Sequence, residues 1–246
     1  IIPKKGGKDE ISITGEYGSF GTFREIIEAR NRLVYASLSR TDSEGFDSHD
    51  DYENTSGNFS LALDPGDRLH LEFEGLHSQT RAALNDGPVI SGGKILEDTD
   101  DPNDRREYAV SHFGTHATVD WDSVVFKNKV GWNDNKRRFV FLADSPFDFN
   151  FDGEFGGEDI TVENSFTFIH NENFQTTVGH QFLREYMEIA TLDLSDQTDQ
   201  YANDFFVEES VNLGNLNLLL SIRENTHEQS KHRTVYDISG VQRVSP

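Results

Sequence analysis

Hydrophobic and polar residues alternate along much of the chain, with a period of two residues. Within residues 69–74, for example, Leu69, Leu71 and Phe73 share one side of an extended segment, and polar residues share the other. The same alternation occurs in the segments 58–63, 160–168 and 216–223. A period of two is typical of β-strands with one apolar and one solvated face. The pattern predicts an all-β fold of about twelve strands.

The connections between these segments are of two kinds, short and long. Four tight turns are predicted at 64–67, at 121–122, at 170–173 and at 212–215, where residues such as Pro, Gly, Asn and Asp favour hairpins. Five long polar connections are predicted at 42–54, 80–106, 133–157, 189–199 and 225–233. Short and long connections alternate along the chain, so each kind is expected at its own end of the sheet. That asymmetry is typical of outer-membrane barrels, with short periplasmic turns and long extracellular loops.

Strand length and aromatic content agree with an antiparallel, up-and-down transmembrane β-barrel. Several strands reach about ten residues, enough to cross a bilayer when tilted. Trp121 and Trp132 lie near opposite ends of one predicted strand, where interfacial tryptophans are expected. Hydrophobic residues make up 35% of the 246 residues, which suits a sheet that has only one apolar face.

Charge and composition exclude several functional classes. The chain has 44 acidic and 22 basic residues, a net charge of −22, so we expect no nucleic acid partner. It contains no cysteine, which excludes disulfides, thiol catalysis and thiolate metal sites. No apolar run is long enough for a transmembrane helix, and no signal peptide opens the sequence at Ile1. No catalytic motif of the serine hydrolase, P-loop or zinc protease type occurs, so we expect no catalytic residues and no enzyme.

Several phrases of the sequence recur in one known family, and in the same order. They are residues 1–6 (IIPKKG), 16–22 (EYGSFGT), 41–46 with 51–54 (TDSEGF and DYEN), 205–209 with 213–216 (FFVEE and LGNL), and 241–246. Together they resemble TonB-dependent outer-membrane receptors. The resemblance implies that residues 1–8 end a plug domain and that 9–246 form the N-terminal half of the barrel, as part of a larger barrel.

The function implied by the resemblance is TonB-energised uptake of a bulky scarce nutrient across the outer membrane of a Gram-negative bacterium. A ferric siderophore, cobalamin or a similar solute would be the ligand, and the ligand-binding residues are unknown. The implied partners are outer-membrane lipid, the nutrient, and TonB through an N-terminal plug region missing from this sequence. Two alternatives stay open: a passive porin-like channel, and a soluble calcium-binding β-sandwich.

One acidic segment matches the spacing of a calcium loop. Asp148, Asn150 and Asp152 alternate before Gly153, and Asp159 occupies the twelfth position, where the motif usually has Glu. These four side chains could present oxygens to one Ca²⁺ ion in an extracellular loop, although the composition favours the alternative interpretation, a solvated acidic loop. No cofactor is required by the sequence.

Two further groups of residues contain side chains that bind metals in other proteins. His112 and His116 are four residues apart, which on a strand places them on one face about 13 Å apart, too far for one ion. We therefore expect both histidines to face the lumen, beside a polar face that bears His70, Glu72 and Glu74. The acidic run at 97–104 has no metal-like spacing and is interpreted as a solvated loop.

Overall fold

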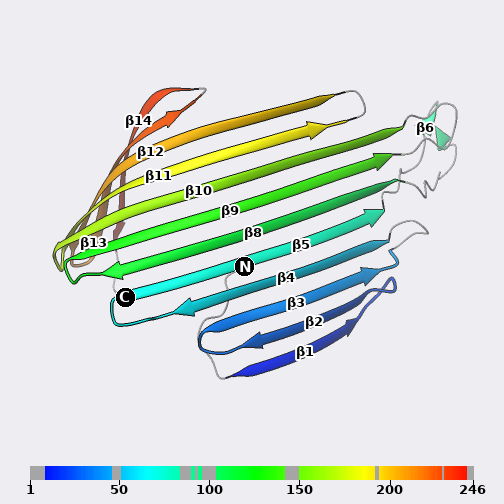
Figure 1. Cartoon of the computed structure of the whole chain (residues 1–246), viewed down its shortest axis with the longest axis horizontal. Coiled ribbons are helices and arrows are strands. Elements are labelled where there is room, and N and C mark those ends of the chain that lie inside the picture. Colours follow the sequence, from blue (N-terminus) through cyan, green and yellow to red (C-terminus); the bar gives the residue numbers. More distant parts are fainter. Residues whose placement is uncertain are drawn as a thin grey trace.

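Twelve strands form one antiparallel sheet in which each strand pairs with the next along the chain (Figure 1). The computed structural model describes residues 9–45, 51–83, 90–91, 94–95, 104–141, 150–191, 194–228 and 230–242. The strands of the sheet are β1 (Glu10–Tyr17), β2 (Phe23–Arg30), β3 (Val34–Ser43), β4 (Tyr52–Leu63), β5 (Leu69–Ala83), β8 (Arg105–Asp120), β9 (Val124–Phe141), β10 (Phe151–Asn171), β11 (Phe174–Ala190), β12 (Ser195–Leu213), β13 (Leu216–His227) and β14 (Ser230–Gln242). Two short strands, β6 (Ile90–Ser91) and β7 (Lys94–Ile95), pair only with each other between β5 and β8.

The up-and-down order confirms the predicted all-β fold and its twelve strands. Within the described residues, β1 and β14 each have one neighbour, so the sheet is not closed. Figure 1 shows the sheet curving, so that β13 and β14 bend away from the plane of the middle strands. No helix long and apolar enough to cross a membrane occurs in the part of the chain that the structure describes.

The two ends of the sheet differ, as the sequence predicted, but less sharply. All four predicted tight turns join consecutive strands at one end, which we call the turn end, and Asp122 (φ 64°) and Gly214 (φ 68°) take the left-handed conformation there. At the opposite end, the loop end, long connections follow β3, β5 and β9.

Two of the predicted long loops were wrong, and a third was too long. The connection between β11 and β12 covers only 191–194, and β13 and β14 are joined by 228–229. Residues 133–141 and 151–157 are strand, so the loop predicted at 133–157 shrinks to 142–150. In each case the strands extend past the apolar section of their outer face, and polar stretches such as 133–138 were read as loop.

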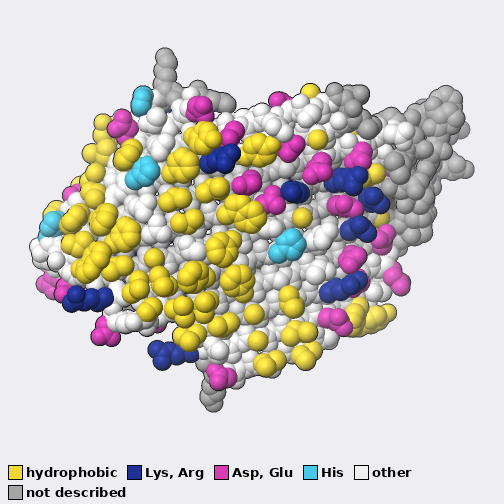
Figure 2. Space-filling model, in the orientation of Figure 1, with side chains coloured by type: hydrophobic (Ala, Val, Ile, Leu, Met, Phe, Trp, Pro, Cys, Tyr) yellow, Lys and Arg dark blue, Asp and Glu magenta, His cyan; other side chains and the backbone are white. Residues whose placement is uncertain are grey.

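One face of the sheet carries an apolar belt at the turn end. Directly paired residues in an antiparallel sheet point to the same side, so the register assigns every side chain to a face. The face that carries Leu71 also carries Ile11, Ile13, Ile27, Leu38, Phe59, Leu61, Leu69, Phe73, Phe113, Phe126, Val130, Trp132, Ile160, Val162, Phe166, Val178, Phe182, Phe205, Val207, Leu220, Ile222 and Ile238. Many are open to the surroundings; Phe113 is 42% exposed and Phe166 is 41% exposed. Figure 2 shows this hydrophobic surface gathered over the turn end. We call this the outer face.

The belt ends at a similar height on neighbouring strands, and charged residues follow it toward the loop end. On β9 the outer face runs from Phe126 through Asn128, Val130 and Trp132 to Asp134 and Lys136, and Asn128 is hydrogen-bonded to Asn164 on the same face. The outer-face residues beyond the belt form a collar: Arg40, Asp42, Glu53, Arg81, Arg105, Glu107, Asp134, Lys136, Arg138, Asp152, Glu154, Glu158, Arg184, Glu188 and Asp199. In Figure 2 most of the charged side chains lie toward the loop end, and a few lie along the margin of the turn end. The strands therefore extend beyond the section that an apolar bilayer core would cover.

Both tryptophans lie at the edges of the belt. Trp121 is in the turn before β9, and Trp132 is the last belt residue of that strand rather than its last residue, because β9 continues to Phe141. Eleven residues of tilted strand span about 25–30 Å along the barrel axis, close to the height of an outer-membrane apolar band. The predicted placement at opposite ends of the strand was wrong in detail, but the two residues do bracket the apolar section.

The opposite face is polar, and no second sheet packs on either face among the described residues. Contacts between strands occur only between sheet neighbours. Leu69, Leu71 and Phe73 are half-buried rather than enclosed, and only Val140, Ala202 and Phe206 are buried apolar residues in the described chain. A β-sandwich would bury the first three against a second sheet. The arrangement is that of a barrel wall.

Candidate functional site: the polar face and its loop end

The polar face carries a connected row of histidines and carboxylates at the turn end. His70 Nδ1 lies 2.6 Å from Asp64 Oδ1, and His70 Nε2 lies 2.7 Å from Glu72 Oε1. An ionised carboxylate only accepts hydrogen bonds, so a ring protonated on both nitrogens would donate to both carboxylates. The ring therefore ties the β4–β5 turn to the polar face of β5.

The row continues across β8 through Glu74. Its carboxylate lies 3.5 Å from His112 Nε2 and 4.0 Å from His116 Nε2, so it separates the two histidines. Both face the polar side, as predicted. No group of three or more His, Asp or Glu side chains suited to a metal ion occurs among the described residues.

Asn133 extends this network to β10. Its Oδ1 lies 2.6 Å from His112 Nδ1, and its Nδ2 donates to Asp159 Oδ1 at 2.7 Å. Because an amide oxygen accepts only, the ring nitrogen of His112 is the donor. Asp159 is thus a member of a wall network on the polar face.

The residues of the predicted calcium loop are not gathered in the described structure. Asp148 lies outside the described residues, and Asn150 is exposed before β10. Asp152 and Asp159 are seven residues apart within β10, so they lie on opposite faces and about 23 Å apart. Asp152 pairs with Arg138 on the outer face. The strand does not bring Asp152 and Asp159 to one ion, and calcium binding at this segment stays a prediction.

At the loop end, the polar face carries an aromatic and arginine cluster that the sequence analysis missed. The register places Arg106, Tyr108, Arg137, Phe139 and Phe155 on that face, on the adjacent strands β8, β9 and β10. We call these five residues the loop-end cluster. The sequence signal for this cluster was the run of phenylalanines at 139–155. We predicted a loop there because these apolar residues share a face with the arginines, so apolar and polar residues do not separate onto opposite faces.

Contacts within the cluster are specific. The guanidinium of Arg137 lies over the ring of Tyr108, 5.1 Å from its centroid, within cation–π range. The rings of Phe139 and Phe155 meet edge to face with centroids 6.0 Å apart. The next pair toward the loops, Phe141 and Phe151, has centroids 5.8 Å apart.

Gly153 allows this aromatic surface to form. It is buried on the same face between two rings, and a Cβ there would lie 2.5 Å from Cζ of Phe151 and 3.4 Å from Cε2 of Phe155. The absence of a side chain lets the rings cover the backbone, the arrangement by which aromatic residues compensate for glycine in a strand.

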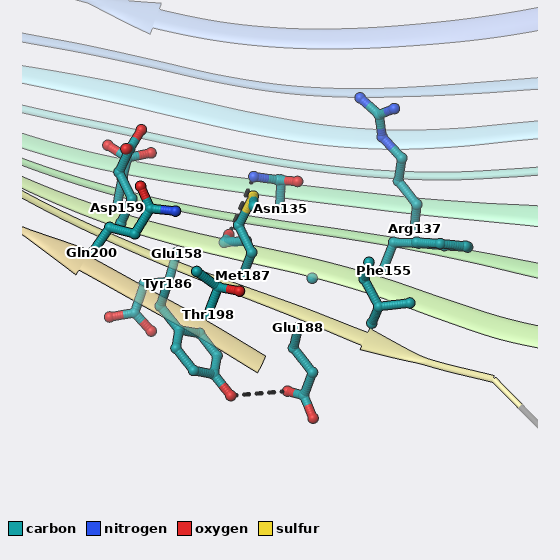
Figure 3. Close-up of a pocket in the computed structure, with 14 residues that line it drawn as sticks. Asn135, Arg137, Phe155, Glu158, Asp159, Tyr186, Met187, Glu188, Thr198 and Gln200 are labelled. Carbon is teal, nitrogen blue, oxygen red and sulfur yellow. Dashed lines mark hydrogen bonds between the residues drawn. The ribbon is translucent and has the colours of Figure 1, made fainter. Parts of the chain in front are cut away.

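A groove of about 490 Å³ opens beside the cluster (Figure 3). Most of its lining comes from the polar face, including Arg137, Phe155, Met187 and Ile189. In Figure 3, Arg137 and Asp159 rise from one side of the sheet, whereas Tyr186 and Glu188 leave from the other. Met187 is 54% exposed and Ile189 is 37% exposed. With Phe155, these side chains place apolar surface on the groove side of an otherwise polar wall.

The comparisons agree with the barrel interpretation. No family model and no curated protein sequence matches the chain. Among solved structures, FpvA of Pseudomonas aeruginosa, bound to a pyoverdine–iron complex, matches 99% of this chain with a TM-score of 0.72 and 11% identity. The ferric enterobactin receptor of P. aeruginosa matches 98% with a TM-score of 0.69 and 12% identity. The ferric yersiniabactin uptake receptor of Yersinia pestis matches 97% with a TM-score of 0.60 and 14% identity.

A twelve-stranded sheet with an apolar outer face and a polar inner face defines a section of an outer-membrane β-barrel wall. Its fold is that of TonB-dependent outer-membrane receptors, so the predicted resemblance is confirmed at the level of fold. The chain spans 41–44% of the length of these three structures. These three solved structures are receptors. By analogy with closed barrels, the polar face is the lumenal face.

Proposed function

We propose that this chain forms the N-terminal half of the barrel of an outer-membrane receptor for energised uptake of a bulky solute. Residues 9–246 form the barrel part. Residues 1–8, which lie outside the residues that the structure describes, form the end of a plug domain. The protein resides in the outer membrane of a Gram-negative bacterium, and TonB acts on it through the plug.

The observation that carries the proposal is the sorting of side chains by face and height. An apolar belt bracketed by Trp121 and Trp132 suits lipid, and the wall behind it is lined by hydrogen-bonded polar groups that suit a water-filled or plugged lumen. The likeness to siderophore receptors over nearly the whole chain supports the same function. The solute is captured at the loop end, where the groove and the loop-end cluster lie.

Membrane insertion is tested with nitroxide labels in the full-length protein, reconstituted in liposomes. The labels are placed at pairs of adjacent strand residues, one of which faces outward and the other of which faces the lumen. Labels at Leu71 and Phe166 should be relaxed by oxygen in the bilayer, whereas labels at Glu72 and Thr167 should be relaxed by a water-soluble nickel chelate. Equal access of the water-soluble agent at all four positions would contradict a membrane barrel.

Energised transport is tested separately, because a passive channel would share the barrel. Uptake of the solute by cells that express the protein should stop when TonB is deleted or when the proton gradient is dissipated. Uptake that continues under both conditions would favour the passive porin-like channel.

A further inference from the structure

The arginines of β8 and β9 fall into two groups by face. Arg105 and Arg138 face outward, and each is ion-paired, to Glu107 at 3.5 Å and to Asp152 at 2.7 Å. Their chain neighbours Arg106 and Arg137 face the lumen and are exposed. Among the described residues, no carboxylate lies within ion-pair distance of either.

The two lumenal arginines are also close to one another. Arg106 is paired in register with Phe139 and Arg137 with Tyr108, so the two arginines are diagonal neighbours whose strand positions lie about 7–8 Å apart. An anion that lies between these neighbouring side chains would be attracted by both guanidinium groups. The chain has a net charge of −22, so it contains enough carboxylates to neutralise both lumenal arginines. The ion pairs of Arg105 and Arg138 show that the same strands neutralise arginines on the outer face.

Flat apolar surface adjoins these charges on one side only. Phe155 pairs in register with both Arg137 and Ile189, and Gly157 next to it pairs with Met187. The carboxylates of Asp159 and Glu185 come next toward the turn end, directly opposite each other. A bound solute therefore meets guanidinium groups and rings nearest the loops, and negative charge below them.

We propose that the loop-end cluster binds an anionic solute that carries a planar aromatic group. The anionic groups accept hydrogen bonds from the forked guanidiniums of Arg106 and Arg137, and the ring packs on Phe155 and the apolar side chains of the groove. Arginine suits this role because one guanidinium both binds oxyanions at two points and stacks on rings. The assignment rests on the receptor function proposed above and names the class of its ligand.

The other ligand classes fit less well. An aliphatic polyanion would use the arginines but leave Phe155, Met187 and Ile189 exposed to water. An aromatic cation would pack on the rings but would be repelled by two unpaired guanidinium groups. A neutral sugar would satisfy neither the charges nor the apolar surface.

The test is equilibrium binding of three probes to the full-length protein in a non-ionic detergent. Pyrenetetrasulfonate is an aromatic polyanion, citrate an aliphatic one, and N-methylacridinium an aromatic cation. Pyrenetetrasulfonate should bind tightest of the three. Arg106→Gln and Arg137→Gln should each weaken its binding about tenfold, as expected for loss of a charged hydrogen bond. Phe155→Leu should weaken it too.

The chain offers matched controls at the adjacent positions. Arg105→Gln and Arg138→Gln remove the same charge at the same height from the outer face, and Phe166→Leu removes an outer ring; all three should leave binding unchanged. Equal weakening by the inner and outer arginine variants would show attraction by overall charge alone and overturn the proposal, as would tighter binding of citrate or N-methylacridinium.

The two proposals fail in distinguishable ways. If the lipid-access labels and the TonB dependence support a receptor while the arginine variants bind pyrenetetrasulfonate normally, only the ligand class is wrong. If the labels show no lipid contact while the variants do weaken binding, the site stands and the receptor function falls.

Discussion

Arg138 and Asp152 face each other across β9 and β10 and are joined by two hydrogen bonds, from Nε to Oδ1 at 2.9 Å and from Nη2 to Oδ2 at 2.7 Å. The pair lies in the charged collar, beyond the apolar belt and outside the membrane-spanning section. The hydrogen bonds from Arg138, and then its charge, lower the pKa of the Asp152 carboxyl below its ordinary value. This two-point contact is the stronger form of an exposed ion pair.

The pair predicts a pH dependence at the loop end of β9 and β10. A carboxyl whose pKa is lower in the folded state stabilises that state above the unfolded pKa, about 4, and the contribution is lost as pH falls through the folded value. The protection factors of amides near Asp152, which are exchange rates corrected for the intrinsic rate at each pH, should therefore be unchanged from pH 7 to pH 5 and lower near pH 3. Asp152→Asn should show lower protection factors already at pH 7, with no further change on acidification.

A control for this prediction is Glu154→Gln, which removes an exposed carboxylate two positions along the same face. It should leave exchange and its pH dependence as in the unmodified protein. Equal effects of the two substitutions would show that general negative charge, not the Arg138 contact, sets local stability.

Calcium binding by the segment around residue 150 remains testable, with a narrower set of ligands than the sequence indicated. Asp159 faces the lumen and Asp152 the outer side, so an ion could use Asp148, Asn150 and Asp152 but not Asp159. Such an ion competes with Arg138 for Asp152, so Arg138→Gln should tighten calcium binding measured by calorimetry, and Asp159→Asn should not change it. Absence of heat in both the unmodified protein and Arg138→Gln would contradict calcium binding.

Gly179 and Phe206 give a stability prediction on the lumenal face. The two residues are directly paired, Phe206 is 7% exposed, and a Cβ at position 179 would lie 2.2 Å from the ring Cζ. The ring is held on its other side by Arg223, whose guanidinium is 5.2 Å from the ring centroid. Gly179→Ala should therefore force the ring aside and cost roughly 1–3 kcal/mol, the usual range for overpacking.

Heat-modified electrophoretic mobility and thermal melting in detergent would measure that loss. Gly131→Ala is the matched control, because a Cβ there meets nothing within 4 Å and the residue lies on the same face. A melting temperature equally lowered by both alanines would point to backbone effects instead of the contact with Phe206.

The sequence was sufficient for the class of fold, and for a physical reason. A strand with lipid on one side and water on the other must alternate, and Leu69, Leu71 and Phe73 show that alternation without reference to any other strand. Loop lengths were not predictable in the same way. Residues 133–141 and 151–157 pair with each other above the belt, where the outer face is charged and the aromatic residues lie on the lumenal face, so the apolar outer pattern that marks the other strands is lost although the backbone is a strand.

The loop-end cluster was missed because its members meet only through register. Arg106 and Arg137 are 31 residues apart, and their proximity depends on how β8 pairs with β9. The composition of either segment alone indicates a polar connection. The polar row of His70, Glu72 and Glu74 was predicted correctly, since those residues alternate within one strand.

Trp121 and Trp132 provide a final prediction, since they are the only tryptophans in the chain. Each lies at an edge of the apolar belt, so both should sit near the lipid headgroups of a reconstituted bilayer, on opposite sides. In the chain's single-tryptophan variants Trp121→Phe and Trp132→Phe, bromine atoms placed near the carbonyl end of the lipid chains should quench fluorescence more than bromines near the bilayer centre. In a full-length protein with additional tryptophans, the comparison requires their replacement as well. Stronger quenching from the bilayer centre at Trp132 would mean that the belt extends into the collar, and that the charged strand ends, including the loop-end cluster, lie deeper in the membrane than the side-chain pattern indicates.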